Sequence, residues 1–308
     1  MRKAVRSYRK AMREFAQMSV LEVWYAHLEV DELAPRFHSS IDPKRTPSVW
    51  KAIDKAKAHD NLQAFAKLAD IVDGECRISH QPPLIVPVET FSEESDPEIV
   101  LAAMAEVIRS YGETLSGDRR RLLEQHRFVH LARKVVGVGS VGTHAWICLL
   151  LDDQGLPLFL QLKEAGTSVV EEFTAPSRYP NHGQRVVAGQ RLMQTASDIF
   201  LGWGRFDWQG EERDYYFRQL RDWKGSADIG GMTHAGMALW GRMCGWTLAR
   251  AHARSGDRVA IAAYLGKSDV FDRAIERFSV AYAEQNERDF EALKEAVSSG
   301  RLMADPSL

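Results

Sequence analysis

The distribution of hydrophobic and polar positions divides the chain into segments with different periods. Apolar residues recur every three or four positions at the N-terminus, at Val5, Tyr8, Met12, Phe15 and Met18. This spacing aligns them along one side of a helix, so residues 1–18 are predicted to form a surface helix with one buried stripe. Segments 48–70 and 97–113 have the same period and are also predicted to be helical. Between them, residues 81–87 contain three prolines, which disfavour a helix and favour extended or turn structure.

A run of short strands is predicted from about residue 126. Residues 129–136, 145–151 and 158–163 are rich in β-branched and other apolar side chains, and turn-forming residues separate them. Because short turns connect neighbouring strands that are antiparallel, these segments predict an antiparallel meander. A helix over residues 182–197 and a further strand over 215–220 follow.

Helical periodicity returns in the last third of the chain. One long helix is predicted over residues 233–254. Residues 257–264 and 268–298 are predicted to form two or three more. Helices and strands that are segregated along the chain are typical of the α+β class. The predicted organisation is a helical N-terminal region (1–125), a lobe with an antiparallel sheet and one helix (126–228), and a helical C-terminal region (229–308).

Composition and charge narrow the class of protein. The 308 residues include 40 Lys and Arg against 42 Asp and Glu, which gives a formal charge of −2. This balance argues against nucleic acid or an anionic membrane as the main partner. The three cysteines, Cys76, Cys148 and Cys244, have no short spacing, so neither a zinc site nor a disulfide framework is expected. The sequence has no long apolar run and no leader, which predicts a cytoplasmic protein without membrane spans and leaves the oligomeric state open.

Phosphate-binding features gather in the central lobe. The turn between its first two strands contains Gly137, Gly139, Ser140, Val141, Gly142 and Thr143, and Lys163 lies on the third strand. Glycine permits positive φ angles and lets backbone N–H groups approach a ligand closely. A concave row of N–H groups suits phosphate oxygens, and the Lys163 ammonium could meet the same phosphates. The segment therefore predicts a phosphate cradle.

A strand follows this glycine turn, which excludes two common phosphate-binding motifs. The dinucleotide-binding fingerprint opens a helix, and the P-loop ends in Gly-Lys-Ser/Thr before a helix. A glycine-rich loop between two strands, with a lysine one strand later, is the protein-kinase arrangement. In that arrangement Gln219 and Leu220 would form the hinge that contacts an adenine edge. The alternative is structural: a common hairpin turn, a solvated Lys163, and buried strand packing at Gln219 and Leu220.

Several long motifs carry a resemblance to a known family. They are VVGVGSVGT at 135–143, LQLKEA at 160–165, NHGQRVV at 181–187, GQRLMQ at 189–194, RQLRDWKGS at 218–226, LARAHARSGD at 248–257 and YAEQNERD at 282–289. Through them the chain resembles, over most of its length, the bacterial family called domain of unknown function 2252. The resemblance implies a kinase-like fold related to aminoglycoside phosphotransferases, with ATP and Mg²⁺ as the expected ligands.

The same resemblance bears on catalysis. Full-length members carry a Gly-Asp-Ala-His…Asn stretch and an Asp-Phe-Asp-like metal site, both upstream of the region present here. The pairs Gly117-Asp118 and Gly256-Asp257 are not followed by a suitable His and Asn, so no catalytic residue and no metal ligand is assigned. We expect a nucleotide-binding relative of phosphotransferases without the catalytic loop and metal site, as a truncated form or one whose start is placed too late. The alternative is a non-enzymatic interaction or regulatory module that retains the fold.

A carboxylate that pairs with Lys163 would complete the kinase arrangement. The helix over residues 182–197 contains no Glu, and the nearest acidic residues in the sequence are Glu164, Glu171 and Glu172. None of them has the helical position that the arrangement requires, so the partner of Lys163 is left unassigned.

Two further groups of polar residues have weaker signals. His252 and Asp257 end the long helix 233–254, where a kinase approaches its catalytic loop, although helix packing or capping is the favoured explanation. Glu284, Asn286 and Asp289 share one helical face and could hold a metal, although a solvated face is favoured.

Overall fold

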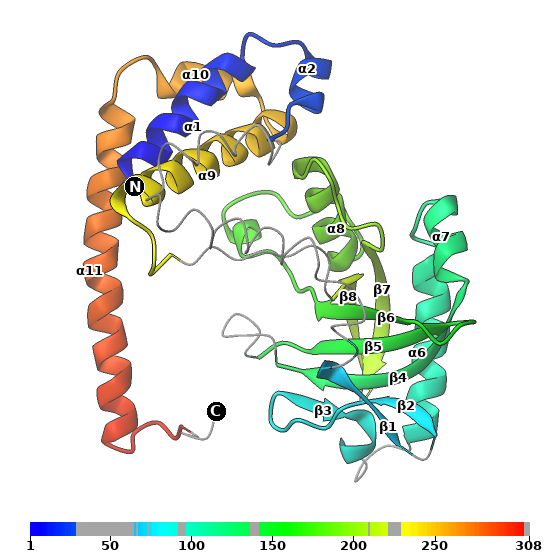
Figure 1. Ribbon diagram of the computed structural model, residues 1–308. Helices are drawn as coiled ribbons and strands as arrows, with labels where there is room; N and C mark the ends of the chain where they lie inside the picture. Colours follow the sequence, from blue (N-terminus) through cyan, green and yellow to red (C-terminus); the bar gives the residue numbers. More distant parts are fainter. Residues whose placement is uncertain are drawn as a thin grey trace. The chain divides into compact units, whose positions relative to one another are not determined.

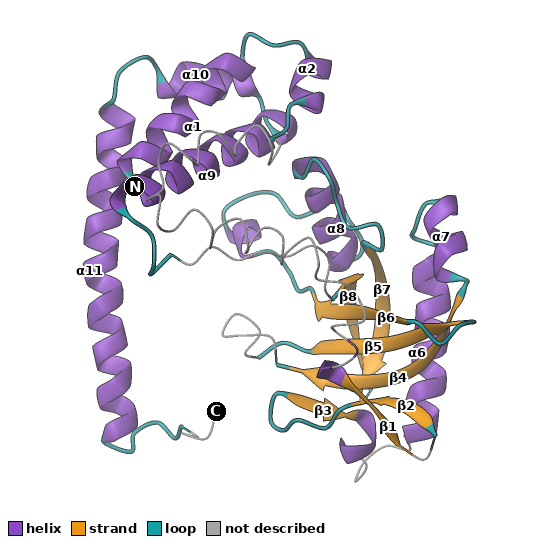
Figure 2. Cartoon of the chain, in the orientation of Figure 1, coloured by secondary structure: helices purple, strands orange, loops and turns teal. Residues whose placement is uncertain are grey.

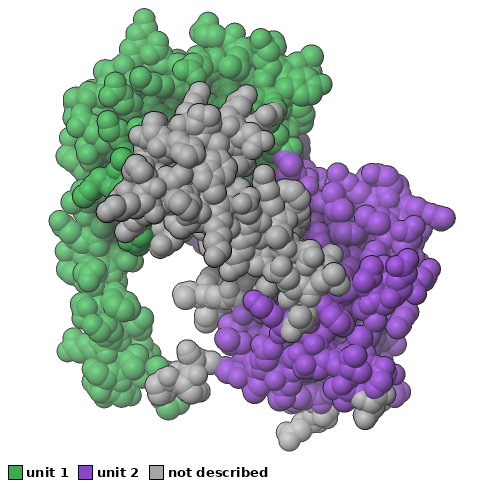
Figure 3. All heavy atoms as spheres, in the orientation of Figure 1, with its two compact units in different colours: residues 1–49, 192–195, 227–308 green, residues 50–191, 196–226 purple. Residues whose placement is uncertain are grey.

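The chain forms two compact units that contain helices and antiparallel sheets. The computed structural model describes residues 1–28, 65, 67–72, 74–91, 97–135, 142–208, 210–220 and 229–304 (Figures 1 and 2). Unit 1 comprises Met1–Val49, Leu192–Thr195 and Ala227–Leu308, and unit 2 comprises Trp50–Arg191 and Ala196–Ser226 (Figure 3). Unit 2 is thus built from the middle of the chain and unit 1 mainly from its two ends.

Unit 2 contains a six-stranded sheet in which every neighbouring pair of strands is antiparallel. The strand order is β3-β4-β5-β6-β8-β7. The strands are β3 (Ile85–Pro87), β4 (His126–Lys134), β5 (Ala145–Asp152), β6 (Pro157–Glu164), β7 (Gly202–Trp208) and β8 (Glu211–Gln219). A separate hairpin joins β1 (Ala69–Val72) to β2 (Glu75–Ile78). Gly155 and Gly210 have φ angles of 77° and 79° and close the tight turns β5–β6 and β7–β8, a conformation that glycine adopts without strain.

One face of the six-stranded sheet packs against helix α6 (Pro97–Gly112), as Figure 1 shows. Tyr111 of α6 stacks on Phe217 of β8 with ring centroids 4.2 Å apart, and both side chains are fully buried. The strands contribute alternate residues to this core, namely Trp146, Cys148 and Leu150 from β5, Leu158, Leu160 and Leu162 from β6, and Tyr215 and Phe217 from β8. These large apolar side chains supply most of the hydrophobic stabilisation of this layer.

The intervening residues of β5 and β6 face the opposite side and form a second core. Ile147, Leu149 and Leu151 of β5 and Phe159 of β6 pack there with Ile78 of β2 and Ile85 of β3, among others. Both faces of these central strands are therefore buried. This explains why their sequences are nearly continuous apolar runs rather than clean alternations.

Helix α8 (His182–Met193) is fixed to the sheet through its first turn. Asp214 of β8 accepts hydrogen bonds from the backbone N–H of His182 and the side-chain amide of Asn181, at 2.8 and 2.7 Å. Gly183 lies directly on β8, because a Cβ atom at this position would stand 2.1 Å from the carbonyl oxygen of Tyr215. Other helical elements among the described residues of unit 2 include α7 (Gly117–Leu123) and the 3₁₀ turns η1 (Val88–Phe91) and η3 (Val169–Glu172).

Unit 1 is a helical unit whose N-terminal helix packs against three C-terminal helices. Its elements are α1 (Arg2–Phe15), α2 (Val20–Tyr25), α9 (His234–Ser255), α10 (Arg258–Leu265) and α11 (Val270–Ser298). Met12, Phe15 and Ala249 are among the residues that form its core. The backbones of α1 and α9 approach so closely that a Cβ at Gly245 would lie 2.1 Å from the carbonyl oxygen of Ala4. Only glycine fits at this crossing.

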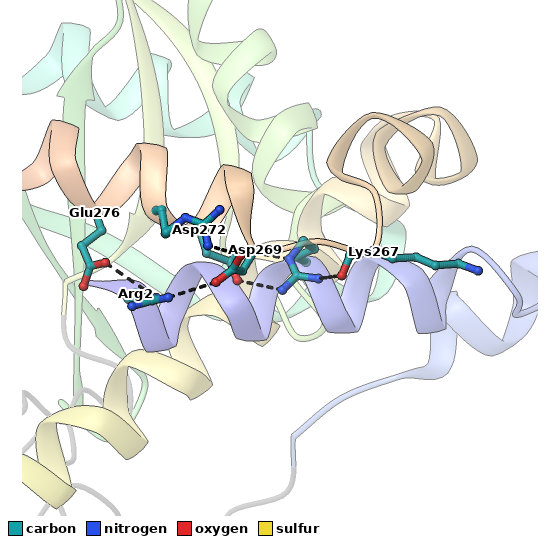
Figure 4. A network of polar contacts seen from close by, with 7 residues as sticks. Arg2, Lys267, Asp269, Asp272 and Glu276 are labelled. Carbon is teal, nitrogen blue, oxygen red and sulfur yellow. Dashed lines mark hydrogen bonds and ion pairs between the residues drawn. The ribbon is translucent and has the colours of Figure 1, made fainter.

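A buried ion pair joins α1 to α11. Nε and Nη2 of Arg9 donate to the two carboxylate oxygens of Asp272 at 2.8 and 2.7 Å, and Nη1 donates to the carbonyl oxygen of Lys267 at 2.9 Å (Figure 4). The side chains are 6% and 1% exposed. Arg258 of α10 adds a further connection, since it donates to the carbonyl oxygens of Phe15, the last residue of α1, and of Met18, which lies just beyond it.

Most elements predicted in the described part of the chain are confirmed. The antiparallel meander corresponds to β4, β5 and β6, and the predicted strand at 215–220 is the second half of β8. The N-terminal helix corresponds to α1, the helix over 97–113 to α6, and the long helix over 233–254 to α9. The mixed fold with antiparallel sheets is confirmed. The three-part division at residues 125 and 228 stays a prediction.

Two element predictions were wrong in detail, and one strand was missed. Residues 48–64 of the helix predicted over 48–70 lie outside the described residues, and Ala69 and Asp70 belong to β1. The helix predicted over 182–197 ends at Met193. The two or three helices predicted over 257–298 are two, α10 and α11, so this prediction is confirmed. β7 was not predicted, because its two glycines and its charged residues within GWGRFDW weaken the strand signal that pairing with β8 restores.

We predict that Asp272→Asn lowers the free energy of unfolding by about 3 kcal/mol, because the Arg9 guanidinium would stay buried without its counter-charge. Urea denaturation followed by tryptophan fluorescence measures this change. Asp269→Asn is the matched control, since Asp269 pairs with the exposed side chains of Arg2 and Arg273 and should leave stability nearly unchanged. Equal losses for the two variants would contradict the assigned importance of the buried pair.

We also predict that Gly183→Ala destabilises unit 2 by about 2 kcal/mol, although alanine is the better helix former, because the new methyl group collides with β8. Thermal and urea unfolding measure the loss. Gly117→Ala is the control, since a Cβ there has no neighbour within 4 Å at the start of α7. A stability of Gly183→Ala equal to that of the parent chain would show that α8 does not dock on β8 as described.

Candidate functional site

The candidate site lies on the face of the six-stranded sheet that carries Lys163. Leu160 and Leu162 of β6 point into the core under α6, so the alternation of the strand directs Gln161 and Lys163 to the other face. Across the sheet, Lys163 pairs with Ala145 of β5 and Tyr216 of β8. Lys163 is therefore held on a strand that is hydrogen bonded on both sides.

Arg218 of β8 lies on the same face, beside Gln161. Gln161 and Arg218 are directly opposite each other in the β6–β8 ladder, two residues along from Lys163 and Tyr216. Side chains that are opposite or diagonal on one face of an antiparallel pair lie within reach of one another. We call Gln161, Lys163 and Arg218 the Lys163 cluster.

The Lys163 cluster holds hydrogen-bond donors in excess of acceptors. Within the described residues, no carboxylate forms an ion pair with Lys163 or Arg218. Gln161 is only 4% exposed, and its Nε2 is buried without an acceptor, as is Nε of Arg218. Burial lowers the pKa of Lys163, and the nearby positive charge of Arg218 lowers it further. A negatively charged or acceptor-rich ligand would relieve all of these costs.

Glu164, the residue next to Lys163, is used on the opposite face. Its Oε2 accepts hydrogen bonds from the backbone N–H of His144 at 2.8 Å and from Nδ1 of the same residue at 2.9 Å. Its Oε1 accepts from Arg213 at 2.7 Å. Burial raises the pKa of this carboxyl, but the hydrogen bonds from His144 and Arg213 outweigh burial and hold the pKa below its usual value.

The other two acidic residues near Lys163 in the sequence also do not pair with it. Glu171 accepts hydrogen bonds from the backbone N–H groups of Ser168 and Ser177 and so shapes the loop around η3. Glu172 is exposed. Since α8 contributes no Glu, the structure assigns Lys163 no carboxylate partner among the described residues, and Arg218 is its charged neighbour instead.

Only the end of the predicted glycine cradle can be described. Gly137, Gly139, Ser140 and Val141 lie outside the described residues. Gly142 has a φ angle of 79°, in the left-handed region that favours glycine, and Thr143 follows it. His144, the residue before β5, donates its backbone N–H to Glu164 and forms a second hydrogen bond with it through Nδ1. The foot of the turn is thus anchored beside the strand pair Ala145–Lys163.

The predicted hinge residues are engaged within the protein. The backbone N–H of Gln219 donates to a carboxylate oxygen of Asp198 at 2.7 Å, and that of Leu220 donates to the carbonyl oxygen of Phe159 at 2.9 Å. The side chain of Leu220 belongs to the second core. Both backbone N–H groups are used within the protein, so neither is free to donate to an adenine edge.

The weaker candidates have structural partners. His252 of α9 forms a 2.8 Å hydrogen bond with the Tyr8 hydroxyl of α1, and Asp257 caps α10 by accepting from the N–H groups of Val259 and Ala260. Asp289 of α11 accepts from the side chain of Gln285. Packing and capping thus account for His252 and Asp257, as favoured.

The described residues contain neither a metal-binding cluster nor a membrane-spanning helix. No group of three or more His, Cys, Asp or Glu side chains among them could hold a metal ion. No helix in the same part of the chain is long and apolar enough to cross a membrane.

Sequence reasoning alone did not single out Gln161 and Arg218 as site residues. The signal was present, because Gln161 is two residues from Lys163 in a strand and must share its face. Arg218 required the register between β6 and β8, which no local pattern specifies.

Comparison with known proteins gives one match. The family model described as "Uncharacterized protein conserved in bacteria (DUF2252)" matches residues 1–296. No curated protein and no solved structure matches the chain. The matched range includes residues of both compact units.

We predict that the contribution of Glu164 to stability depends on pH. Because the pKa of Glu164 is lowered on folding, its stabilisation is complete above the usual Glu value of 4.5 and is lost as the pH falls through the lowered value. Glu164→Gln should therefore cost about 1–2 kcal/mol at pH 7 and much less near pH 3. Urea unfolding at both pH values measures this difference. Glu172→Gln, at an exposed position, should change stability little at either pH. A loss for Glu164→Gln that is equal at the two pH values would disprove the charge-dependent role.

Proposed function

The chain belongs to the DUF2252 family of bacterial proteins, and we propose that it binds a nucleotide, holding the phosphates on the sheet face that carries Lys163. The family match confirms the resemblance carried by the long motifs. The phosphates would lie between Lys163 and the end of the glycine turn at Gly142 and Thr143. We include the turn residues Gly137, Gly139, Ser140 and Val141 in this proposal on sequence grounds.

One observation carries the proposal: two cationic side chains share a face without an acidic partner among the residues that the structure describes. Like charges disfavour each other, and burial adds to the cost, as the lowered pKa of Lys163 reflects. A chain with 42 acidic residues has many available counter-charges. A cationic pair that is left uncompensated next to buried donors is typical of a site that receives an anion.

The order of elements supports a kinase-like relationship. A strand, a glycine turn, a strand, a tight turn and a strand with Lys163 are followed by helix α8 and two more strands, and the last of these, β8, lies beside β6. In kinases a glycine-rich loop covers the phosphates, and a lysine on the third strand contacts them. In this sheet, Lys163 lies near the end of the glycine turn, because it pairs with Ala145, three residues after Gly142.

The proposal is limited to binding. Phosphoryl transfer requires a carboxylate that orients or deprotonates the acceptor and ligands for Mg²⁺. The carboxylates that lie nearest to Lys163 in the chain, Glu164 and Glu171, accept hydrogen bonds from the protein itself. Bound Mg²⁺ would neutralise phosphate charge. No described residue is assigned to hold it.

We predict that Lys163→Met weakens nucleotide binding by tenfold or more, because a charge-assisted hydrogen bond to phosphate contributes about 1.5–3 kcal/mol. Isothermal titration of the full chain with ATP and with GTP, each with Mg²⁺, measures the dissociation constants. Lys294→Met is the control, because Lys294 is an exposed lysine of α11 that pairs with Glu291, and it should bind as the parent chain does. Absence of binding in the parent chain, or equal binding by Lys163→Met, would overturn the proposal and favour a non-enzymatic interaction module.

A further inference from the structure

Helix α11 carries large apolar side chains that remain accessible to solvent. Its first turn contributes Phe271 to the core of unit 1, whereas every residue from 280 to 295 is exposed. The most exposed aromatic and leucine side chains of this helix are Phe278, Tyr282, Phe290 and Leu293, at 63%, 62%, 54% and 51%. Single exposed apolar residues are common on protein surfaces, but a contiguous set of this size is typical of an interaction surface.

These side chains lie along one side of the helix. Counted with Asn286, they follow one another in steps of three or four residues, and Val297 extends the series by one more such step. This spacing places them in a single row on a helix. We call the six residues from Phe278 to Val297 in this row the α11 stripe. The rings of Phe278 and Tyr282 stack with centroids 5.9 Å apart, so part of the stripe already forms a flat apolar surface.

The α11 stripe is nearly symmetric about Asn286. Tyr282 and Phe290 lie four residues before and after it, and Phe278 and Leu293 lie eight before and seven after. A surface with this symmetry matches itself when a second copy runs in the opposite direction, as an isologous two-fold interface requires. Asn286 would then face the same residue of the second copy, and one polar residue within an apolar seam fixes the register of paired helices.

The packing of α1 favours the antiparallel direction. Helix α1 covers the first turns of α11, where Arg9 pairs with Asp272. In a parallel pair both copies of α1 would meet at the same end of the two helices. In an antiparallel pair they lie at opposite ends and leave the stripe accessible.

The area of the stripe is sufficient for a weak specific interface. Phe and Tyr side chains each bury about 150–250 Å² when they are fully covered. At the exposed fractions of the stripe, two copies would remove roughly 1,000 Å² from water, which is near the lower limit for specific association.

We propose that α11 pairs with α11 of a second copy of this chain, antiparallel and centred on Asn286, so that the protein forms a homodimer. The interface uses residues of unit 1 and is independent of the proposed nucleotide site, which lies on unit 2. An interface of this size is expected to have a micromolar dissociation constant.

Sedimentation velocity of the full chain from about 1 to 100 μM tests the dimer, and the parent chain is expected to pass from monomer to dimer over this range. Asn286→Asp should weaken dimerisation tenfold or more, because two carboxylates would face each other at the symmetry axis. Asn286 is exposed in the single chain, so this variant keeps the fold. Phe290→Glu should weaken dimerisation in the same way.

Arg277→Gln is the matched control. It changes the net charge by the same amount as Asn286→Asp, at a residue that is also exposed. Arg277 lies nine residues before Asn286, which is two and a half helical turns, so its side chain is on the opposite side of α11. This variant should dimerise as the parent chain does.

Oxidative cross-linking tests the direction of the pair. Phe278→Cys and Leu293→Cys are made in a Cys244→Ser chain, since Cys244 is exposed. In an antiparallel pair, residue 278 of one copy lies beside residue 293 of the other, whereas identical positions are separated by more than about 20 Å. A mixture of the two variants should therefore form a cross-linked dimer, and neither variant should do so alone.

Three results would overturn the inference. The first is a parent chain that stays monomeric at about 100 μM. The second is a dimer that Asn286→Asp and Phe290→Glu leave unchanged, which would place the interface elsewhere. The third is cross-linking of each cysteine variant alone but not of the mixture across the two positions, which would make the pair parallel. Circular dichroism and the thermal midpoint of each variant establish that the fold is retained.

Discussion

The position of β6 between β5 and β8 is the constraint on which unit 2 and its candidate site depend. Because β6 is hydrogen bonded on both sides, its side chains can alternate between two faces in only one register. Leu158, Leu160 and Leu162 complete the core under α6, and this burial directs Gln161 and Lys163 to the opposite face. A slip of one residue would bury the lysine among leucines and aromatic rings. The hydrophobic burial of these leucines under α6 thus also determines the sheet face on which Gln161 and Lys163 lie.

The hydrogen bonds of unit 2 bear on the charge of the expected ligand. Three of its buried or half-buried carboxylates accept hydrogen bonds from the protein: Glu164 from His144 and Arg213, Asp198 from Gln219, and Asp214 from Asn181 and His182. Gln161 and Arg218 each retain a buried nitrogen without an acceptor, as do Arg185, Arg191 and Arg213 elsewhere in this unit, while Oε2 of Glu89 is a buried acceptor without a donor. The free-energy cost of leaving a buried donor unpaired is larger than the net gain from one hydrogen bond. The Lys163 cluster would therefore be stabilised by a ligand that brings hydrogen-bond acceptors.

Much of the fold could be predicted from local patterns, and the site only in part. The period of α1 and the apolar runs of β5 and β6 are signals within a few residues, and the long motifs led to the family. β7 could not be predicted, because its stability comes from pairing with β8 and not from its own residues. Lys163 could be recognised from the sequence because it follows the glycine turn by one strand. The position of Arg218 beside Gln161 could not, because it depends on the register between two strands whose paired residues are 57 positions apart. The use of the Gln219 N–H by Asp198 is likewise a tertiary effect that the hinge analogy could not anticipate.

The buried pair of Arg9 and Asp272 also dictates a sequence of events during synthesis. The two residues are 263 positions apart, and α9, which packs most extensively on α1, lies more than 200 residues after it. The residues of unit 2 are all translated before either partner of α1 exists. Because domains fold as units while the chain emerges, unit 2 can close on the ribosome, while α1, with its basic surface and apolar stripe, waits unpaired. Contacts of such high sequence separation form slowly, so the apolar stripe of α1 becomes covered only after the C-terminal helices have been made.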